Sequence, residues 1–284
     1  MVTTGLMDAM LVQGAPADLV AALAEPLPRT VVCELLGIPE QERAPLFDFS
    51  RAISIAEGFD PDEFAAIGTA ASQYLLGLID RKRDNPTEDV LSALVQVHDE
   101  DGVRLTADEM VMTVILLFGA GQESTMSQLG KSVLLLLSRY PDQWARLVAA
   151  PELVPGAVEE LLRVIPLGPA TQPRMATEDV MVSDEVLTAG TTVFPIPTAA
   201  NRDPAVFPDP DRFDIERPEA AQHLTFGRGL HFCIGAPMAR MELQIALHNL
   251  VTRTPGLRMA DLHGEPDWLP ETATQLVRTL PVVW

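Results

Sequence analysis

The stretch that decides the fold reads Phe226-Gly227-Arg228-Gly229-Leu230-His231-Phe232-Cys233-Ile234-Gly235. It places one cysteine in a glycine-rich loop, and a helix-forming run from Ala236 to Val251 follows directly. Pro237 suits the first turn of that helix, and Ile234, Met238, Met241 and Ile245 follow at helical spacing. A thiolate before a helix N-terminus feels the positive end of the helix dipole, and the glycines allow a flat partner to approach closely. The loop therefore suits an anionic sulfur that binds a metal.

Two ordinary explanations compete with that interpretation. A lone cysteine is often only a small buried apolar residue, and a glycine-rich turn is often only a turn. The full pattern, however, resembles the haem loop of the cytochrome P450 family, Phe-Gly-x-Gly-x-His-x-Cys-x-Gly, at every specified position. The resemblance implies heme b as the cofactor, with Cys233 as the thiolate ligand of its iron. It also implies cofactor contacts from the remaining matched positions, with His231 near a haem propionate: Phe226, Gly227, Gly229, His231 and Gly235.

A second polar segment, Ala120-Gly121-Gln122-Glu123-Ser124-Thr125, lies inside a long apolar helix. A mid-helix glycine costs up to ~1 kcal/mol, and an unpaired charge in an apolar setting is costly. A polar face turned to solvent is the alternative explanation. The segment resembles the oxygen-binding groove of the P450 central helix, which implies that Ala120 and Gly121 line the haem and that Glu123 relays protons. Ser124 stands where the family usually has threonine, with Thr125 beside it, so we expect looser proton delivery.

Other matches extend the resemblance. Glu160 and Arg163 resemble the Glu-x-x-Arg pair of the family, and Arg212 resembles the arginine that joins them in a buried network; a surface pair is the alternative. Arg174 matches a position that pairs with a haem propionate. Substrate contacts are expected from Phe118, Gly119, residues 167–171 and residues 273–275. Arg228 and Arg240 are expected to attract an acidic electron donor.

Composition narrows the class of protein. The 284 residues carry a formal net charge of -20, which argues against nucleic-acid and anionic membrane surfaces. Two cysteines make no disulfide framework, and Cys33 lies in an apolar run typical of a core. Neither a signal peptide nor a membrane-spanning run is visible, so we expect a cytoplasmic protein without membrane or nucleic-acid partners.

The order of helical and strand patterns is also informative. Nearly all of the first 165 residues have helical character, with a short helix expected from Pro16. Thr106 and Glu109 form a capping box for a helix that reaches about Tyr140, roughly 50 Å long. Its segment 111–118 is apolar nearly all round, which predicts burial on every side. Strands 180–182 and 191–194 indicate a small hairpin-rich sheet, and residues 272–284 indicate a further hairpin.

The resemblance implies a mainly α-helical chain, in which residues 1–284 form one cytochrome P450 domain with a helical lobe and a small β-rich lobe. The implied activity is haem-dependent monooxygenation of a small organic substrate by O2, with electrons from NAD(P)H through a ferredoxin. P450 chains have further elements before the point where Met1 aligns, so we expect an N-terminally incomplete fold that holds haem less firmly. The alternatives are a non-catalytic scaffold derived from the family and a haem-thiolate carrier or sensor.

Overall fold

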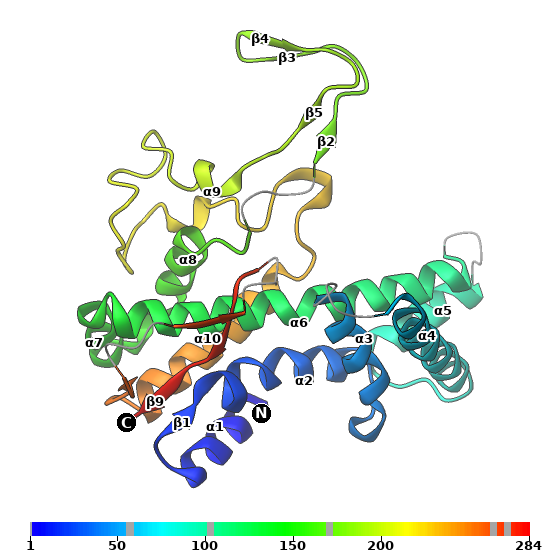
Figure 1. Cartoon of the computed structure of the whole chain (residues 1–284), viewed down its shortest axis with the longest axis horizontal. Coiled ribbons are helices and arrows are strands. Elements are labelled where there is room, and N and C mark those ends of the chain that lie inside the picture. The colour runs from blue at the N-terminus through cyan, green and yellow to red at the C-terminus, as the bar shows by residue number, and fades with distance from the viewer. Residues whose placement is uncertain (1, 55–59, 101–104, 169–172, 262–265, 270–273) are drawn as a thin grey trace. The chain divides into compact units, whose positions relative to one another are not determined.

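The computed structural model describes residues 2–54, 60–100, 105–168, 173–261, 266–269 and 274–284. Contacts divide the chain into two compact units, residues 1–134 with 256–284 and residues 135–255. The long helix α6, Ala107–Ser138, begins in the first unit and ends in the second (Figure 1). None of the described helices combines the length and the apolar character that a bilayer span requires.

The first unit is mostly helical. Its elements are α1 Val2–Gln13, β1 Ala17–Asp18, η1 Val20–Ala24, α2 Pro26–Leu35, η2 Glu40–Glu42, α3 Ala44–Ser54, α4 Pro61–Asp84, α5 Val90–Glu100, most of α6, β6 Arg258–Met259, β7 Asp267–Leu269, β8 Leu276–Thr279 and β9 Pro281–Val283. The strands form a three-stranded antiparallel sheet in the order β1-β9-β6 and a separate β7-β8 pair. The unit is therefore closed by strands from both ends of the chain.

Local chemistry sets the ends of the main helices. The Asp60 side chain caps α4 by accepting a hydrogen bond from the Asp62 N–H at 2.9 Å. The predicted capping box of α6 is confirmed, because the Glu109 N–H donates to Thr106 Oγ1 at 3.2 Å and the Thr106 N–H donates to Glu109 Oε2 at 2.8 Å. The apolar faces of α2, α4, α5 and α6 then meet in one core cluster that includes Val32, Leu75, Leu91, Met110 and Phe118.

Three expectations for this unit are wrong. Residues after Pro16 form strand β1 before the η1 turn, because Ala17 and Asp18 pair with Val282 and Pro281 of β9. Helix α6 is not buried on every side, since Met112 and Leu116 are 61% and 68% exposed. Strands β8 and β9 do not pair with each other. Strand β8 pairs with β7, and β9 lies between β1 and β6 in the other sheet. Leu280, between β8 and β9, is buried, and its N–H donates to Asp18 Oδ1.

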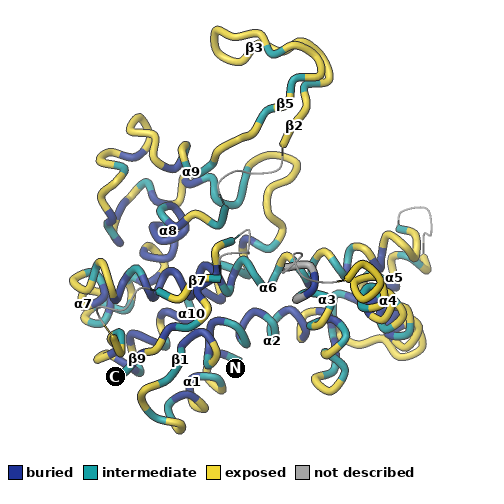
Figure 2. Tube along the Cα trace, viewed as in Figure 1, coloured by how far each residue is buried: buried dark blue, intermediate teal, exposed yellow. Residues whose placement is uncertain are grey.

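The second unit holds the cysteine loop. Its elements are the end of α6, α7 Pro141–Ala149, η3 Pro151–Leu153, α8 Val154–Val164, β2 Arg174–Met175, β3 Val180–Val182, β4 Glu185–Leu187, β5 Thr192–Val193, α9 Pro197–Ala200, η4 Ala220–Gln222, η5 Gly229–His231 and α10 Ala236–Arg253. The β3-β4 hairpin is nested inside the β2-β5 pair, which confirms the hairpin-rich segment. Figure 2 shows this hairpin exposed along most of its length.

Helix α10 packs through a face different from the one its apolar spacing indicates. Its buried residues include Leu243, Leu247 and Leu250. Ile234, Met241 and Ile245, in contrast, are exposed large apolar side chains. The helix is thus apolar on both sides, which is why the periodicity predicts the helix but not its buried face.

Glu242 lies on the buried face of α10, 3% exposed, and neither carboxyl oxygen has a hydrogen-bond partner among the described residues. Burial raises the pKa of Glu242 to about 7. The folded state therefore binds this proton more tightly than the unfolded state, so stability is greatest below the unfolded pKa of about 4.5 and falls as pH rises toward 7. We expect ionisation of Glu242 to lower the free energy of unfolding of wild type by about 3 kcal/mol across that pH window. Glu242→Gln should not show this decrease.

Urea unfolding at pH values below and above this window measures the effect. Glu178→Gln removes a carboxylate that is exposed in the loop before β3, and serves as the control. Identical pH dependence in wild type and Glu242→Gln would contradict a raised pKa at this position.

Candidate functional site

The cysteine loop is a chain of tight turns. The Gly227 N–H donates to Leu224 O at 2.9 Å, and the Phe232 N–H donates to Gly229 O at 3.0 Å. Gly227 and Gly229 have φ of 73° and 82°, a region that residues with a side chain rarely adopt. The Cys233 N–H donates to Phe226 O at 2.9 Å and closes the loop. Helix α10 then begins at Ala236, so Cys233 stands just before a helix N-terminus, as the sequence predicts.

The residues around Cys233 fit a haem. Cys233 is exposed, whereas Cys33 is buried and burial raises the pKa of its thiol to about 11. Large apolar side chains next to Cys233 are also exposed: Leu230, Phe232 and Ile234. The described residues contain no cluster of His, Cys, Asp and Glu that would hold a metal ion by itself. An accessible cysteine sulfur with exposed apolar side chains around it is the arrangement expected where a flat apolar cofactor is held by a sulfur ligand.

The two predicted propionate partners are exposed. Arg174 lies on β2 and His231 at the end of η5. Among the described residues, neither side chain has an ion-pair partner. Their pairing with a cofactor stays a prediction.

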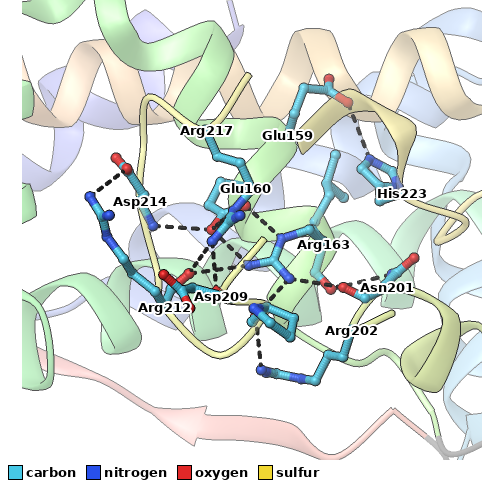
Figure 3. Close-up of polar contacts among 12 residues, drawn as sticks. Glu159, Glu160, Arg163, Asn201, Arg202, Asp209, Arg212, Asp214, Arg217 and His223 are labelled. Atoms are coloured by element: carbon cyan, nitrogen blue, oxygen red, sulfur yellow. Dashed lines mark hydrogen bonds and ion pairs between the residues drawn. The ribbon is translucent and has the colours of Figure 1, made fainter. Parts of the chain in front are cut away.

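A buried ionic network lies within the second unit, as Figure 3 shows. Arg163 binds Glu160 through two parallel hydrogen bonds of 2.7 and 2.8 Å, and both side chains are fully buried. This part of the prediction is confirmed. The expectation that Arg212 is the third member of the network is wrong. The Arg212 side chain is 68% exposed, and its guanidinium binds Asp214.

Arg217 takes the place expected for Arg212. Its Nε donates to Glu160 Oε1 at 3.2 Å, and its two Nη atoms donate to the carbonyls of Pro208, Asp209 and Arg212. Arg212 contributes only its main-chain oxygen. The sequence contains a signal for this role. Phe213, Ile215 and Arg217 alternate with acidic residues, so Arg217 follows the pattern of two apolar residues that are buried in the structure.

Asn201 connects this network to the cysteine loop. Its carbonyl accepts a hydrogen bond from Arg163 Nη1 at 2.8 Å, and its side-chain oxygen accepts one from the Leu224 N–H at 2.7 Å. Thr225 Oγ1 donates to Leu162 O on α8 at 2.7 Å. The first residues of the loop are therefore fixed to α8, which supports the predicted structural role of the network.

The polar segment of α6 belongs to the first unit. Ser124 Oγ donates to Ala120 O at 2.8 Å, a side-chain bond to the carbonyl one turn earlier. Thr125 is buried and Gly121 half-buried, while Ala120 is exposed. Glu123 Oε1 accepts a hydrogen bond of 2.6 Å from Thr274 Oγ1. The acid that the sequence singles out is thus held by a residue far along the chain.

Lys131 and Ser127 fix the same Thr274. Ser127 Oγ donates to Thr274 O at 3.1 Å, and Lys131 Nζ donates to the same carbonyl. Burial lowers the pKa of Lys131 to about 8. Sequence analysis assigned no role to Lys131, although a lysine inside the apolar run 129–137 is itself a signal of a buried charge.

The expected substrate-contact residues have mixed environments. Phe118 is buried and stacks on Phe47 at 5.9 Å, whereas Gly119 faces open space. Leu167 and Gly168 line a cavity of about 210 Å³ with Asn201 and Thr225. Residues 169–171 and 273 lie outside the described residues, so these contacts stay predictions.

Two arginines were expected to be available to an acidic partner. Arg228 is exposed and, within the described residues, has no ion-pair partner. Arg240 is not available in this way, because Glu159 binds its guanidinium at 2.7 and 3.0 Å. The position of Arg240 after the cysteine predicts that it lies near the loop, but it does not predict the contact with the half-buried Glu159 on α8.

Comparison with known proteins gives a consistent result. A family model described as Cytochrome P450 matches residues 41–254. The chain is 47% identical to Nocardicin C N-oxygenase of Nocardia uniformis subsp. tsuyamanensis, over 100% of this chain and 70% of that protein. It is 43% identical to Mycinamicin IV hydroxylase/epoxidase of Micromonospora griseorubida, over 98% of this chain and 70% of that protein. The solved LnmA cytochrome P450 hydroxylase of Streptomyces atroolivaceus superposes with a TM-score of 0.93 at 40% identity, over 99% of this chain and 72% of that one.

Proposed function

Since the chain belongs to the cytochrome P450 family and has the fold of its members, we propose that it is a monooxygenase of secondary metabolism with Cys233 as the thiolate ligand of haem iron. The relatives are P450 oxygenases and hydroxylases, which supports a monooxygenase activity. The names of these two relatives include the compounds nocardicin C and mycinamicin IV, which supports a small organic substrate of secondary-metabolite type. The observation that carries the proposal is the exposed Cys233 before α10 with exposed apolar side chains beside it.

We propose that both compact units act together as one catalytic domain. The family match spans residues 41–254 and so includes parts of each unit. The predicted proton-handling residues lie in the first unit and the predicted haem ligand in the second.

The bound haem supplies the redox chemistry with O2, and the protein supplies its ligand, its surroundings and protons. Cys233 would donate the sulfur, and the lack of side chains at Gly227 and Gly229, both at positive φ, would let the loop backbone approach the cofactor. Phe226, Gly235, Ala120 and Gly121 are proposed as cofactor contacts, and Arg174 and His231 as propionate partners.

Proton delivery is assigned to the acid and hydroxyl groups of α6. Glu123 is proposed as the acid. Its Oε1 accepts a hydrogen bond from Thr274 Oγ1, with 2.6 Å between the two oxygen atoms. Ser124 and Thr125 are proposed to pass protons through their hydroxyls, which donate and accept. The Ser124 hydroxyl is bound to Ala120 O at 2.8 Å, and it has to leave that carbonyl before it can donate elsewhere.

The electrons are proposed to come from NAD(P)H through a ferredoxin-type donor. Arg228 lies exposed in the cysteine loop and offers a cation to an acidic donor. A non-catalytic scaffold is the competing function. The Glu123–Thr274 hydrogen bond favours the enzyme, because a scaffold has no use for a carboxylate held in this position inside α6.

The activity is tested with haem-loaded protein, NADPH, a ferredoxin and its reductase, and the substrates nocardicin C and mycinamicin IV, under isotopically labelled O2. We expect a product that carries one labelled oxygen atom, and no product without the ferredoxin. Labelled water in place of labelled O2 is the control. Substrate that stays unchanged while NADPH is consumed at the substrate-free rate would contradict the proposed substrate class.

A further inference from the structure

Glu159 on α8 binds one side chain before the cysteine loop, His223, and one after it, Arg240 on α10. Its carboxylate accepts two hydrogen bonds from Arg240, Nε to Oε1 at 2.7 Å and Nη2 to Oε2 at 3.0 Å. The same carboxylate lies 3.2 Å from His223 Nε2. His223 Nδ1 accepts a hydrogen bond from the Thr225 N–H at 3.1 Å. Nε2 therefore carries the ring proton and donates a hydrogen bond to Glu159 Oε2. One acid therefore orients two side chains, and Figure 3 shows its contact with His223.

Both of these side chains contact the ring of Phe226. The guanidinium carbon of Arg240 lies 4.6 Å from the ring centroid, which is cation–π geometry. The His223 ring packs against the same ring at a centroid distance of 5.7 Å. Two groups that Glu159 fixes therefore contact the Phe226 ring.

Phe226 is linked directly to the cysteine. Its carbonyl accepts the Cys233 N–H at 2.9 Å. A shift of Phe226 therefore shifts or breaks the one main-chain hydrogen bond that closes the loop at the sulfur-bearing residue. The ring also contacts Phe232, the residue before the cysteine, at 6.5 Å.

The ion pair differs from an ordinary surface pair. The side chain of Glu159 is 15% exposed, that of His223 is fully buried, and that of Arg240 is 28% exposed. Burial by itself would raise the pKa of Glu159, but hydrogen bonds from His223 and Arg240 and the charge of Arg240 lower it to about 2. The carboxylate stays ionised at neutral pH, so the two contacts persist there.

We propose that Glu159, His223 and Arg240, here called the Phe226 bracket, are positioning residues that hold the Cys233 thiolate in place for the haem iron. They act through the Phe226 ring and its carbonyl, and none of them is expected to touch the iron. The proposal rests on the proposed ligation of haem by Cys233. It also gives Arg240 a role other than attraction of an acidic partner.

The test uses the haem-loaded full chain in its reduced, CO-bound form. The readout is the rate at which the red-shifted band of a thiolate-ligated haem converts to the unshifted band of a haem without thiolate. We expect this rate to rise about tenfold in Arg240→Gln and in Glu159→Gln, which corresponds to ~1.4 kcal/mol. The double variant is expected to convert less than about a hundredfold faster than wild type, the product of the two tenfold changes, because both changes break the Glu159–Arg240 contact.

Arg228→Gln is the matched control, since it removes an exposed cation from the same loop. We expect its conversion rate to lie within twofold of the wild-type rate. Arg240→Lys should convert at a rate between those of wild type and Arg240→Gln, because it keeps the charge but loses the bidentate contact. Equal rates for Arg240→Gln and Arg228→Gln would overturn the bracket. If Arg240→Gln does not fold, Arg240→Lys decides: a wild-type rate in that variant rejects the proposal. A wild type without the red-shifted band instead overturns the proposed ligation, and the bracket with it.

Discussion

Cys233→Ser will abolish the red-shifted ferrous–CO band of this protein. A serine hydroxyl is not ionised at neutral pH and does not replace a thiolate on haem iron. We expect the variant to lose the band completely and to lose monooxygenase activity with it. The measurement is an absorption spectrum of the reduced, CO-treated protein at equal haem content.

Cys33→Ser provides the matched control. Cys33 is the other cysteine of the chain, and it is fully buried in the core of the first unit. We expect this variant to keep the red-shifted band, since the residue has no access to a cofactor from within the core. A band that survives in Cys233→Ser would show that another group ligates the iron.

Arg217→Ala will destabilise the fold by about 3–5 kcal/mol, because it removes a buried guanidinium that donates to Glu160 and to three main-chain carbonyls. Glu160 would keep Arg163 but lose the second guanidinium at 3.2 Å. The carbonyls of Pro208, Asp209 and Arg212 would lose their common donor at the same time. Haem content is expected to fall as well, because Asn201 links this network to the cysteine loop.

Arg212→Ala is the decisive comparison. Both variants remove one arginine from the same segment, but the Arg212 side chain is exposed and binds only Asp214. An exposed pair contributes about 0–1 kcal/mol. Urea unfolding of both variants beside wild type measures the difference. A larger loss in Arg212→Ala than in Arg217→Ala would restore the assignment that the sequence favours.

The sequence predicts the helices and the cysteine loop well because their signals are local. The Thr106–Glu109 capping box and the residues after Cys233 fix two helix starts through contacts within one turn. Glycines at positive φ likewise mark the turns of the loop. These features depend on neighbouring residues alone.

Partners that are distant in sequence escape such reasoning. Arg212 and Arg217 lie in one short segment, and only the path of the chain decides which guanidinium reaches Glu160 on α8. Thr274 meets Glu123 across 151 positions, and no local pattern marks it as a partner of that acid. The exposure of Ile234 and Met241 similarly depends on which side of α10 packs inward.

The three-stranded sheet has a consequence for the order in which the chain matures during synthesis. Ala17 of β1 pairs with Val282 of β9, and Met259 of β6 pairs with the same residue from the other side. Translation delivers residues 135–255 before β9, so the second unit can fold on the ribosome while the first unit still lacks its central strand. Until Val282 emerges, β1 remains an open edge available to other nascent chains. The three-stranded sheet therefore forms only after the second unit has been translated.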